Sequence, residues 1–179
     1  MARKYEQRQR ARARLETRRR ITEATVELHR TIGPARTTIS AIAERAGVQR
    51  LTVYRHFPDE RALFAACGEL WSRESPPPDP AGWSDPTEAL TELYGWYRRN
   101  ADVIGNVQHD APAMPVLAEV ADYGPYLRAC REALLSPGAT RRARAAAGHA
   151  LEFSTWRSLT AQGLSDREAA ALMSALVEG

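Results

Sequence analysis

The stretch that decides the fold is Thr38-Ile-Ser-Ala-Ile-Ala-Glu-Arg-Ala-Gly-Val-Gln-Arg-Leu-Thr-Val-Tyr-Arg-His-Phe57. Gly47 predicts a sharp turn between two short helices, because glycine readily adopts a positive φ. Ala43, four residues earlier, is small enough for the two helices to cross closely, and Thr38 is placed to cap the first of them. The apolar contacts between these helices are assigned to Ile39, Ile42, Ala46, Val48 and Val53. The ordered set predicts a helix-turn-helix.

The outer face of the second short helix is predicted to enter the major groove of DNA. Arginine can bond bidentately to guanine and glutamine to adenine, and threonine or apolar side chains can touch the methyl group of thymine. Tyr54 and His56 suit phosphate better than base edges. Thr38 and Arg61 are also placed to reach the DNA backbone. The exposed candidates on the helix itself are Gln49, Arg50, Leu51, Thr52, Tyr54, Arg55 and His56.

The charges of the chain are distributed unevenly. Residues 1–67 contain 15 Lys and Arg against 7 Asp and Glu, whereas residues 68–179 contain 10 against 15. This asymmetry indicates a polyanion-binding head and a different task for the remainder. Residues 2–20 carry nine basic residues against two glutamates, a composition that fits a solvated tail, a basic arm that becomes ordered on DNA, or an extension of the first helix.

The remaining pattern predicts an all-α fold of about nine or ten helices. We expect a basic arm or helix extension at residues 1–16, a three-helix domain at 17–67 and a helical bundle at 68–179. Gly33-Pro34 ends the first helix, and Asp59 starts a helix that runs to about Glu74. A proline-rich loop is expected at 75–82. The bundle helices are expected at about 86–100, 101–109, 116–135 with a disturbance at Tyr123-Gly124-Pro125, 140–161 and 166–177.

Residues 17–67 resemble the DNA-binding domain of the TetR (tetracycline-repressor-like) family of regulators. The resemblance implies a homodimer whose two heads read a palindromic operator, and a C-terminal domain that dimerises and binds a small molecule. Leu51 departs from the pattern, since many members have a small or basic residue there, and this affects the expected base preference. The residues on which this resemblance rests are Thr38-Ile39, Ile42-Ala43, Ala46-Gly47-Val48, the run Thr52-Val53-Tyr54-Arg55-His56-Phe57, and Ala62-Leu63-Phe64. In that pattern the DNA-facing positions are Thr38, Gln49, Arg50, Thr52, Tyr54 and His56.

The C-terminal helices provide two further sets of candidates. The run Phe153-Ser-Thr-Trp156-Arg-Ser-Leu159, followed by Gln162-Gly163-Leu164-Ser165, is similar to the last two helices of many actinobacterial-type members. This likeness favours a dimer interface over an intramolecular core of the same spacing, at Leu151, Leu159, Leu164, Ala169, Leu172, Met173, Leu176 and Val177. A second set predicts either the lining of a ligand cavity or an ordinary core, and comprises Tyr94, Tyr97, Met114, Tyr126, Phe153 and Trp156.

Other protein classes find little support in the sequence. No stretch is apolar enough for a membrane span, and no apolar run follows the arginine-rich N-terminus as a secretory signal would require. Cys67 and Cys130 lack metal-type spacing and are expected to be reduced, and His109-Asp110 alone does not make a metal site. With scattered histidines, no phosphate-binding glycine loop and no nucleophile elbow, we expect no enzyme, no metal and no cofactor.

The sequence therefore predicts a bacterial, cytoplasmic, nucleoid-associated transcriptional regulator. We expect a repressor that is released from a palindromic operator by a small hydrophobic or aromatic effector. Its expected partners are double-stranded DNA and a second copy of itself, and no membrane. Two alternatives remain open: an accessory or architectural DNA-binding protein without a ligand, which a packed C-terminal core would favour, and an adaptor that has lost DNA binding, against which the basic recognition face argues.

Overall fold

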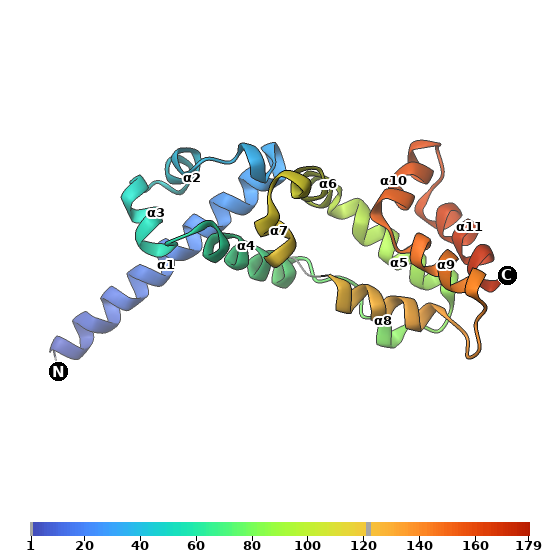
Figure 1. The fold of residues 1–179 in the computed structure, drawn as a ribbon. Coiled ribbons are helices and arrows are strands. Elements are labelled where there is room, and N and C mark those ends of the chain that lie inside the picture. Colours follow the sequence, from blue (N-terminus) through green and yellow to red (C-terminus); the bar gives the residue numbers. More distant parts are fainter. Residues whose placement is uncertain (1, 121–122) are drawn as a thin grey trace. The chain divides into compact units, whose positions relative to one another are not determined.

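The structure, a computed structural model that describes residues 2–120 and 123–179, is helical throughout (Figure 1). This described part contains eleven α-helices and no strand, which confirms the all-α fold with slightly more helices than expected. The chain divides into two compact units, Met1–Ser75 with Gly105–Ala121, and Pro76–Ile104 with Asp122–Gly179. No helix in the described ranges is both long and apolar enough to cross a membrane.

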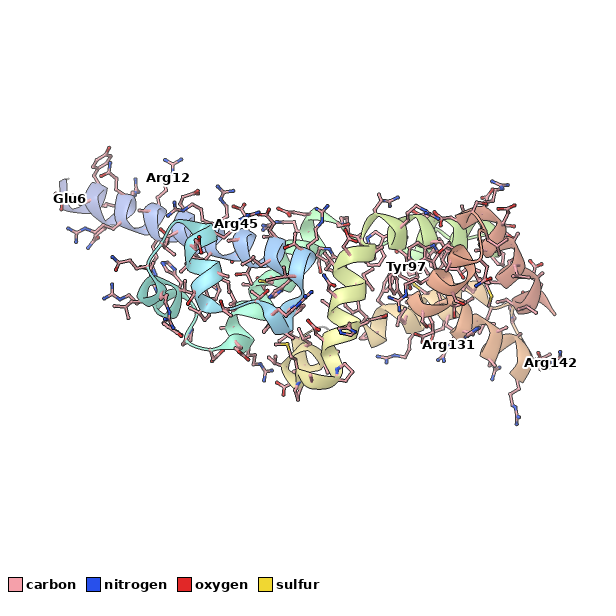
Figure 2. All side chains as sticks on the ribbon, turned by 90° about the horizontal axis from the view of Figure 1, so that it is seen from above. Glu6, Arg12, Arg45, Tyr97, Arg131 and Arg142 are labelled. Atoms are coloured by element: carbon pink, nitrogen blue, oxygen red, sulfur yellow. The ribbon has the colours of Figure 1, made fainter. Side chains whose placement is uncertain are left out.

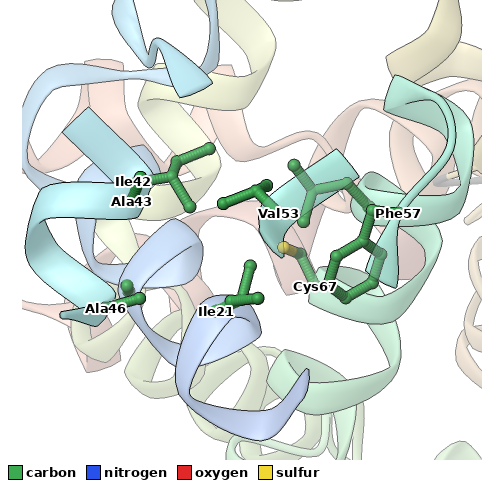
Figure 3. Packing of buried hydrophobic residues seen from close by; sticks show 9 residues of the cluster. Ile21, Ile42, Ala43, Ala46, Val53, Phe57 and Cys67 are labelled. Carbon is green, nitrogen blue, oxygen red and sulfur yellow. The ribbon is translucent and has the colours of Figure 1, made fainter. Parts of the chain in front are cut away.

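The first unit is built from α1 (Ala2–Ile32), α2 (Ile39–Ala46), α3 (Arg50–His56) and α4 (Glu60–Glu74), which share one apolar core. Because α2 and α3 are far too short to be stable alone, the burial of their apolar side chains must hold them in place. Figure 3 shows α2 meeting this core through Ile42 and the small side chains of Ala43 and Ala46. The buried cluster comprises Ile21, Ala24, Ile42, Ala43, Ala46, Val53, Phe57, Leu63 and Cys67.

The boundaries of the helix-turn-helix are set by the caps that the sequence predicts. At the start of α2 the Thr38 hydroxyl oxygen accepts a hydrogen bond from the amide of Ala41 at 3.1 Å. Gly47 ends α2 in the left-handed region, with a φ of 63°. At the start of α4 the carboxylate of Asp59 accepts from the amide of Ala62 at 2.7 Å. These local features begin α2 and α4, and end α2, at the expected positions.

A segment from the middle of the chain completes the first unit. It comprises the second half of α6 (Ala101–Asp110), the short 3-10 helix η3 (Ala111–Ala113) and α7 (Pro115–Val120). The side-chain amide of Asn106 donates to the carbonyls of His29 and Arg30, at 3.0 and 2.8 Å, in the last turn of α1. The carboxylate of Asp110 accepts from the amide of Ala35 at 2.8 Å. Polar contacts from a distant segment thus secure the end of α1.

The second unit contains α5 (Pro86–Arg99), α8 (Gly124–Leu134), α9 (Arg141–Ala150), α10 (Phe153–Ala161) and α11 (Asp166–Glu178). α11 packs along both α5 and α9, and α8 packs against α9. Asp85 caps α5 by accepting from the amide of Glu88 at 2.8 Å, and Ser165 and Glu168 form the expected capping box on α11. The core of this unit includes Leu90, Leu93, Tyr94, Ala147, Ala150, Ala169, Ala170, Met173 and Val177.

The prediction of a single helix at residues 140–161 is wrong, because α9 and α10 are separate helices. The hydroxyl groups of Tyr94 and Tyr97 donate to the carbonyls of Ala150 and Leu151, at 2.8 and 2.6 Å. In a continuous helix these carbonyls would accept from amides four residues further along. Two tyrosines of α5 therefore donate to the carbonyls that the end of α9 leaves without helical partners. Because these tyrosines are distant in the sequence, the helical periodicity of residues 140–161 does not reveal the break.

The structure also selects one of the alternatives for the N-terminal segment and divides a second expected helix. α1 begins at Ala2, so the basic segment at residues 2–16 is an extension of the first helix rather than a separate tail. The helix expected at 116–135 is divided into α7 and α8, and α8 begins in the predicted disturbance, with Pro125 in its first turn. Residues 121–122 lie outside the described part of the chain.

Gly33→Ala is expected to lower the free energy of unfolding by at least about 1 kcal/mol, because an L side chain is strained in the left-handed region. Gly33 has a φ of 85°, and a Cβ added there would lie 2.7 Å from Oδ2 of Asp110. Gly68→Ala in α4 is the matched control, since its Cβ would enter open space. That change should stabilise the helix by up to about 1 kcal/mol. Chemical denaturation measures both, and a Gly33→Ala variant as stable as the parent would contradict this reading of the turn.

Candidate DNA-binding site

α3 holds most of the predicted DNA-facing side chains at the surface of the first unit. Val53 is its only buried residue, with an exposed fraction of 0%, whereas Leu51 and Tyr54 are 56% and 47% exposed. Within the residues that the structure describes, neither Arg50 nor Arg55 has an ion-pair partner. The exposed residues at α3 and its N-cap are Gln49, Arg50, Leu51, Tyr54 and Arg55, and the half-buried ones are Thr52 and His56.

Thr38 and Arg61 flank this helix in the sequence, and each already has a partner. The hydroxyl oxygen of Thr38 accepts the capping bond of α2, and its proton is free to be donated to an anion. The guanidinium of Arg61 pairs with the carboxylate of Glu119 on α7 at 3.0 Å. Both side chains are largely exposed, so this ion pair contributes at most about 1 kcal/mol. Arg61 can therefore exchange Glu119 for a phosphate at little cost.

The N-terminal part of α1 is a helical arm, which we define as residues 4–16 and whose residues are all exposed. Figure 2 shows Arg12 standing away from the helix in this arm. Further along α1, the charge of Arg19 is compensated by Glu16 and Glu23, at 2.8 and 2.6 Å. Apart from Arg19, the arginines between residues 8 and 20 have no ion-pair partner in the described residues, and these are Arg8, Arg10, Arg12, Arg14, Arg18 and Arg20.

Arg18 has a contact that sequence reasoning did not assign to it. Its Nη1 atom donates to the carbonyl of His56, the last residue of α3, at 2.7 Å. Its guanidinium carbon also lies 4.1 Å from the centre of the Phe57 ring. Burial lowers the pKa of His56 below its ordinary value, and the positive charges of Arg14 and Arg18 lower it further. His56 is therefore a neutral imidazole near pH 7. It can donate a hydrogen bond to a phosphate but does not add a positive charge.

Four of the six predicted ligand-pocket residues lie together in the second unit. Tyr97, Phe153 and Trp156 form an aromatic cluster in the second unit, with ring centres 5.2 to 6.0 Å apart, and Tyr94 lies 6.2 Å from Tyr97. Each of these four rings is at most 5% exposed. Burial raises the pKa of Tyr94 and of Tyr97, and both hydroxyls are occupied by backbone carbonyls. The cluster therefore has the burial of a core.

The two remaining pocket candidates, Tyr126 and Met114, belong to different units. Tyr126 belongs to the second unit, where its hydroxyl donates to the carbonyl of Pro78 at 3.1 Å. Met114 belongs to the first unit. A role in ligand binding stays a prediction for all six residues.

The predicted dimer residues are divided between two faces of α11 and its neighbours. Leu172 and Leu176 are 47% and 56% exposed, and Ala171 and Ala175 beside them are exposed as well. These positions form a continuous apolar stripe at spacings of three and four residues. Leu159 and Leu164 are half-buried. The other candidates, Leu151, Ala169, Met173 and Val177, are buried within their own unit.

A short helix that packs against a second one across a glycine turn, and that exposes basic and polar side chains, is the arrangement found in helix-turn-helix DNA-binding proteins. Residues 21–67 match the family described as bacterial regulatory proteins, tetR family. Residues 21–67 are thus a DNA-binding domain of the tetR family of regulators, which confirms the resemblance seen in this part of the sequence. The match includes the whole helix-turn-helix and α1 from Ile21 onward, and it ends at Cys67.

The fold is similar to solved structures of bacterial regulators. A proposed transcriptional regulator from Streptomyces coelicolor A3(2) has a TM-score of 0.62 at 21% identity, with 92% of this chain and 99% of that chain covered. A transcriptional regulator from Rhodococcus sp. RHA1 has a TM-score of 0.61 at 21% identity, with 90% and 94% covered. A proposed TetR-family regulator from Mesorhizobium loti MAFF303099 has a TM-score of 0.53 at 20% identity, with 92% and 95% covered. No curated protein matches the chain in sequence.

Proposed function

We propose that the protein is a homodimeric repressor that binds a palindromic operator through α3 and leaves it when a small molecule binds the second unit. The observation that carries this proposal is the outer face of α3, where Arg50 and Arg55 are exposed beside Gln49 and have no ion pair within the described residues. Unpaired guanidinium groups on a helix that lies on a small core are suited to the major groove. DNA as the ligand would place the protein on the bacterial nucleoid.

The side chains around α3 divide by chemistry into base-reading and backbone-binding groups. Arg50 is the candidate for a bidentate contact with guanine, and Gln49 for one with adenine. Leu51 and Thr52 offer methyl groups to thymine. The remaining side chains are assigned to phosphates, which fix the register of the protein but carry no sequence information. They are Thr38, Tyr54, Arg55, His56 and Arg61.

The proposed dimer uses the exposed apolar stripe of α11, defined by Ala171, Leu172, Ala175 and Leu176. The opposite side of the same helix is already filled within the unit, because Ala169 and Met173 are buried. A helix with a second apolar face needs a second surface to cover it, and a two-fold axis lets one stripe cover another copy of itself. Such a dimer would present two α3 helices to two half-sites of an inverted repeat.

Release by an effector is supported by the aromatic cluster of the second unit and by the path of α6. α6 begins in the second unit and continues into the first, where Asn106 and Asp110 bond to the end of α1 and the start of η1 (Pro34–Arg36). A ligand that favours one arrangement of α6 would weaken DNA binding by the same factor as DNA weakens ligand binding, commonly about 1–3 kcal/mol. The close packing of the aromatic rings favours a second candidate, an accessory DNA-binding protein without a ligand.

Arg50→Glu is expected to abolish the specific DNA complex, since it replaces a potential guanine contact by a charge that phosphates repel. The test is a gel-shift titration on DNA flanking the protein's own gene, with excess nonspecific competitor. Arg131→Glu, the same change at an exposed position on α8, is the control and should retain the complex. If Arg50→Glu keeps a competitor-resistant footprint, the assignment of α3 as the recognition helix is wrong.

Removal of residues 2–14 is expected to weaken binding to any duplex and to flatten its salt dependence. Log K decreases linearly with the logarithm of the salt concentration. This decrease should become less steep by about 0.9 for every phosphate that the shortened protein no longer neutralises. Fluorescence anisotropy at several salt concentrations measures the slope for an operator and for a random duplex. An unchanged slope on both duplexes would show that the arm does not contact the DNA backbone.

Leu172→Glu combined with Leu176→Glu is expected to convert the dimer into a monomer, because the proposed interface would bury four carboxylates. Both positions are exposed in the single chain, so helicity and thermal stability of the subunit should change little. Light scattering after size-exclusion chromatography gives the mass. Arg131→Glu, which introduces a glutamate at an exposed position of α8, is the control and should remain dimeric. A double variant that stays dimeric would place the interface elsewhere.

A further inference from the structure

We propose that Arg18 is the positioning residue of the recognition helix, holding the carboxyl end of α3 to α1 so that the outer face of α3 meets the bases in register. This inference rests on the proposed function for its effect on operator binding. Its structural basis is independent of DNA, since it lies in the contact of Arg18 with His56 and Phe57.

α3 needs support at its ends because it is only seven residues long. Its N-cap residue, Gln49, makes no side-chain capping bond, unlike Thr38 at α2 and Asp59 at α4. At the other end the amide of Phe57 donates to the carbonyl of Val53 at 2.9 Å. Beyond Val53 the later carbonyls of α3 lack helical partners, and Arg18 supplies one of them with a donor. The recognition helix is therefore held mainly from its carboxyl end.

The guanidinium group of Arg18 combines three stabilising roles at this end. It donates to the carbonyl of His56 at 2.7 Å, a short charge-assisted bond. It lies over the ring of Phe57, which is only 3% exposed and belongs to the core. Its positive charge also lies at the negative end of the α3 dipole. A planar cation can stack on the ring and donate in its own plane at the same time, which a lysine ammonium cannot do.

The neighbouring arginines show that this role is specific to Arg18. Arg19 is engaged by Glu16 and Glu23, and Arg20 is exposed without an ion pair in the described part of the chain. Arg18 is half-buried, three residues before the fully buried Ile21, and so lies on the core side of α1. Its charge is committed to the protein rather than offered to a phosphate. Loss of Arg18 should therefore reduce specific binding without removing a phosphate contact.

Arg18→Met tests the proposal in the full-length protein, with Arg20→Met as the matched control at a nearby exposed position of the same helix. Arg18→Met should raise the Kd for the operator at least about 10-fold, as expected for the loss of a hydrogen bond to a charged group. Its Kd for a random duplex and its salt slope should change no more than in Arg20→Met. Equal weakening on operator and random DNA would identify Arg18 as a phosphate contact and overturn the proposal.

Amide hydrogen exchange of the free protein separates positioning from a general loss of stability. Arg18→Met should speed exchange at the amides of Val53 and Phe57 at least several-fold more than at Ile42 or Ala46 in α2, whereas Arg20→Met should leave all of them unchanged. Uniform acceleration across α2 and α3, or none at all, would overturn the positioning role. If the parent protein recognises no operator, the proposed function fails, and the exchange result still decides whether Arg18 holds α3.

Discussion

The burial of Val53 and Phe57 is the constraint on which the DNA-binding surface depends. Both belong to the core that α1, α2 and α4 share, and they bracket the carboxyl half of α3. A helix of seven residues gains too little from its own hydrogen bonds to persist in water, so its outer face exists only while this inner contact holds. Ala43 is part of the same constraint, because a small side chain lets α2 approach the core closely.

Not all of the basic side chains in residues 1–67 are available to bind DNA phosphates. Some of its arginines are neutralised within the protein: Arg19 pairs with Glu16 and Glu23, and Arg45 on α2 pairs with Glu27 on α1. Arg18 faces inward, so its charge stabilises α3 instead of meeting a phosphate. Most of the basic groups left over lie in the arm of α1 or on the outer face of α3. This division separates affinity for any polyanion from the reading of bases.

Features set by local chemistry could be predicted from the sequence, and features set by distant contacts could not. The caps at Thr38 and Asp59 and the turn at Gly47 depend on a few adjacent residues, and the structure contains them. The break between α9 and α10 depends on hydroxyls from α5, and the fixed end of α1 on Asn106. The role of Arg18 could have been suspected only from its spacing to Ile21 within a run of otherwise equivalent arginines.

The most direct test of the central claim, that α3 reads a defined sequence as part of a dimer, is selection of bound duplexes from a randomised pool. We predict enrichment of an inverted repeat whose half-site centres lie one helical turn, about 10–10.5 base pairs, or a multiple of it apart. The half-site should lose its preferred base at one position when Arg50 is replaced by alanine. A pool that stays random through successive rounds, while the protein binds all duplexes alike at low salt, would contradict sequence-specific regulation.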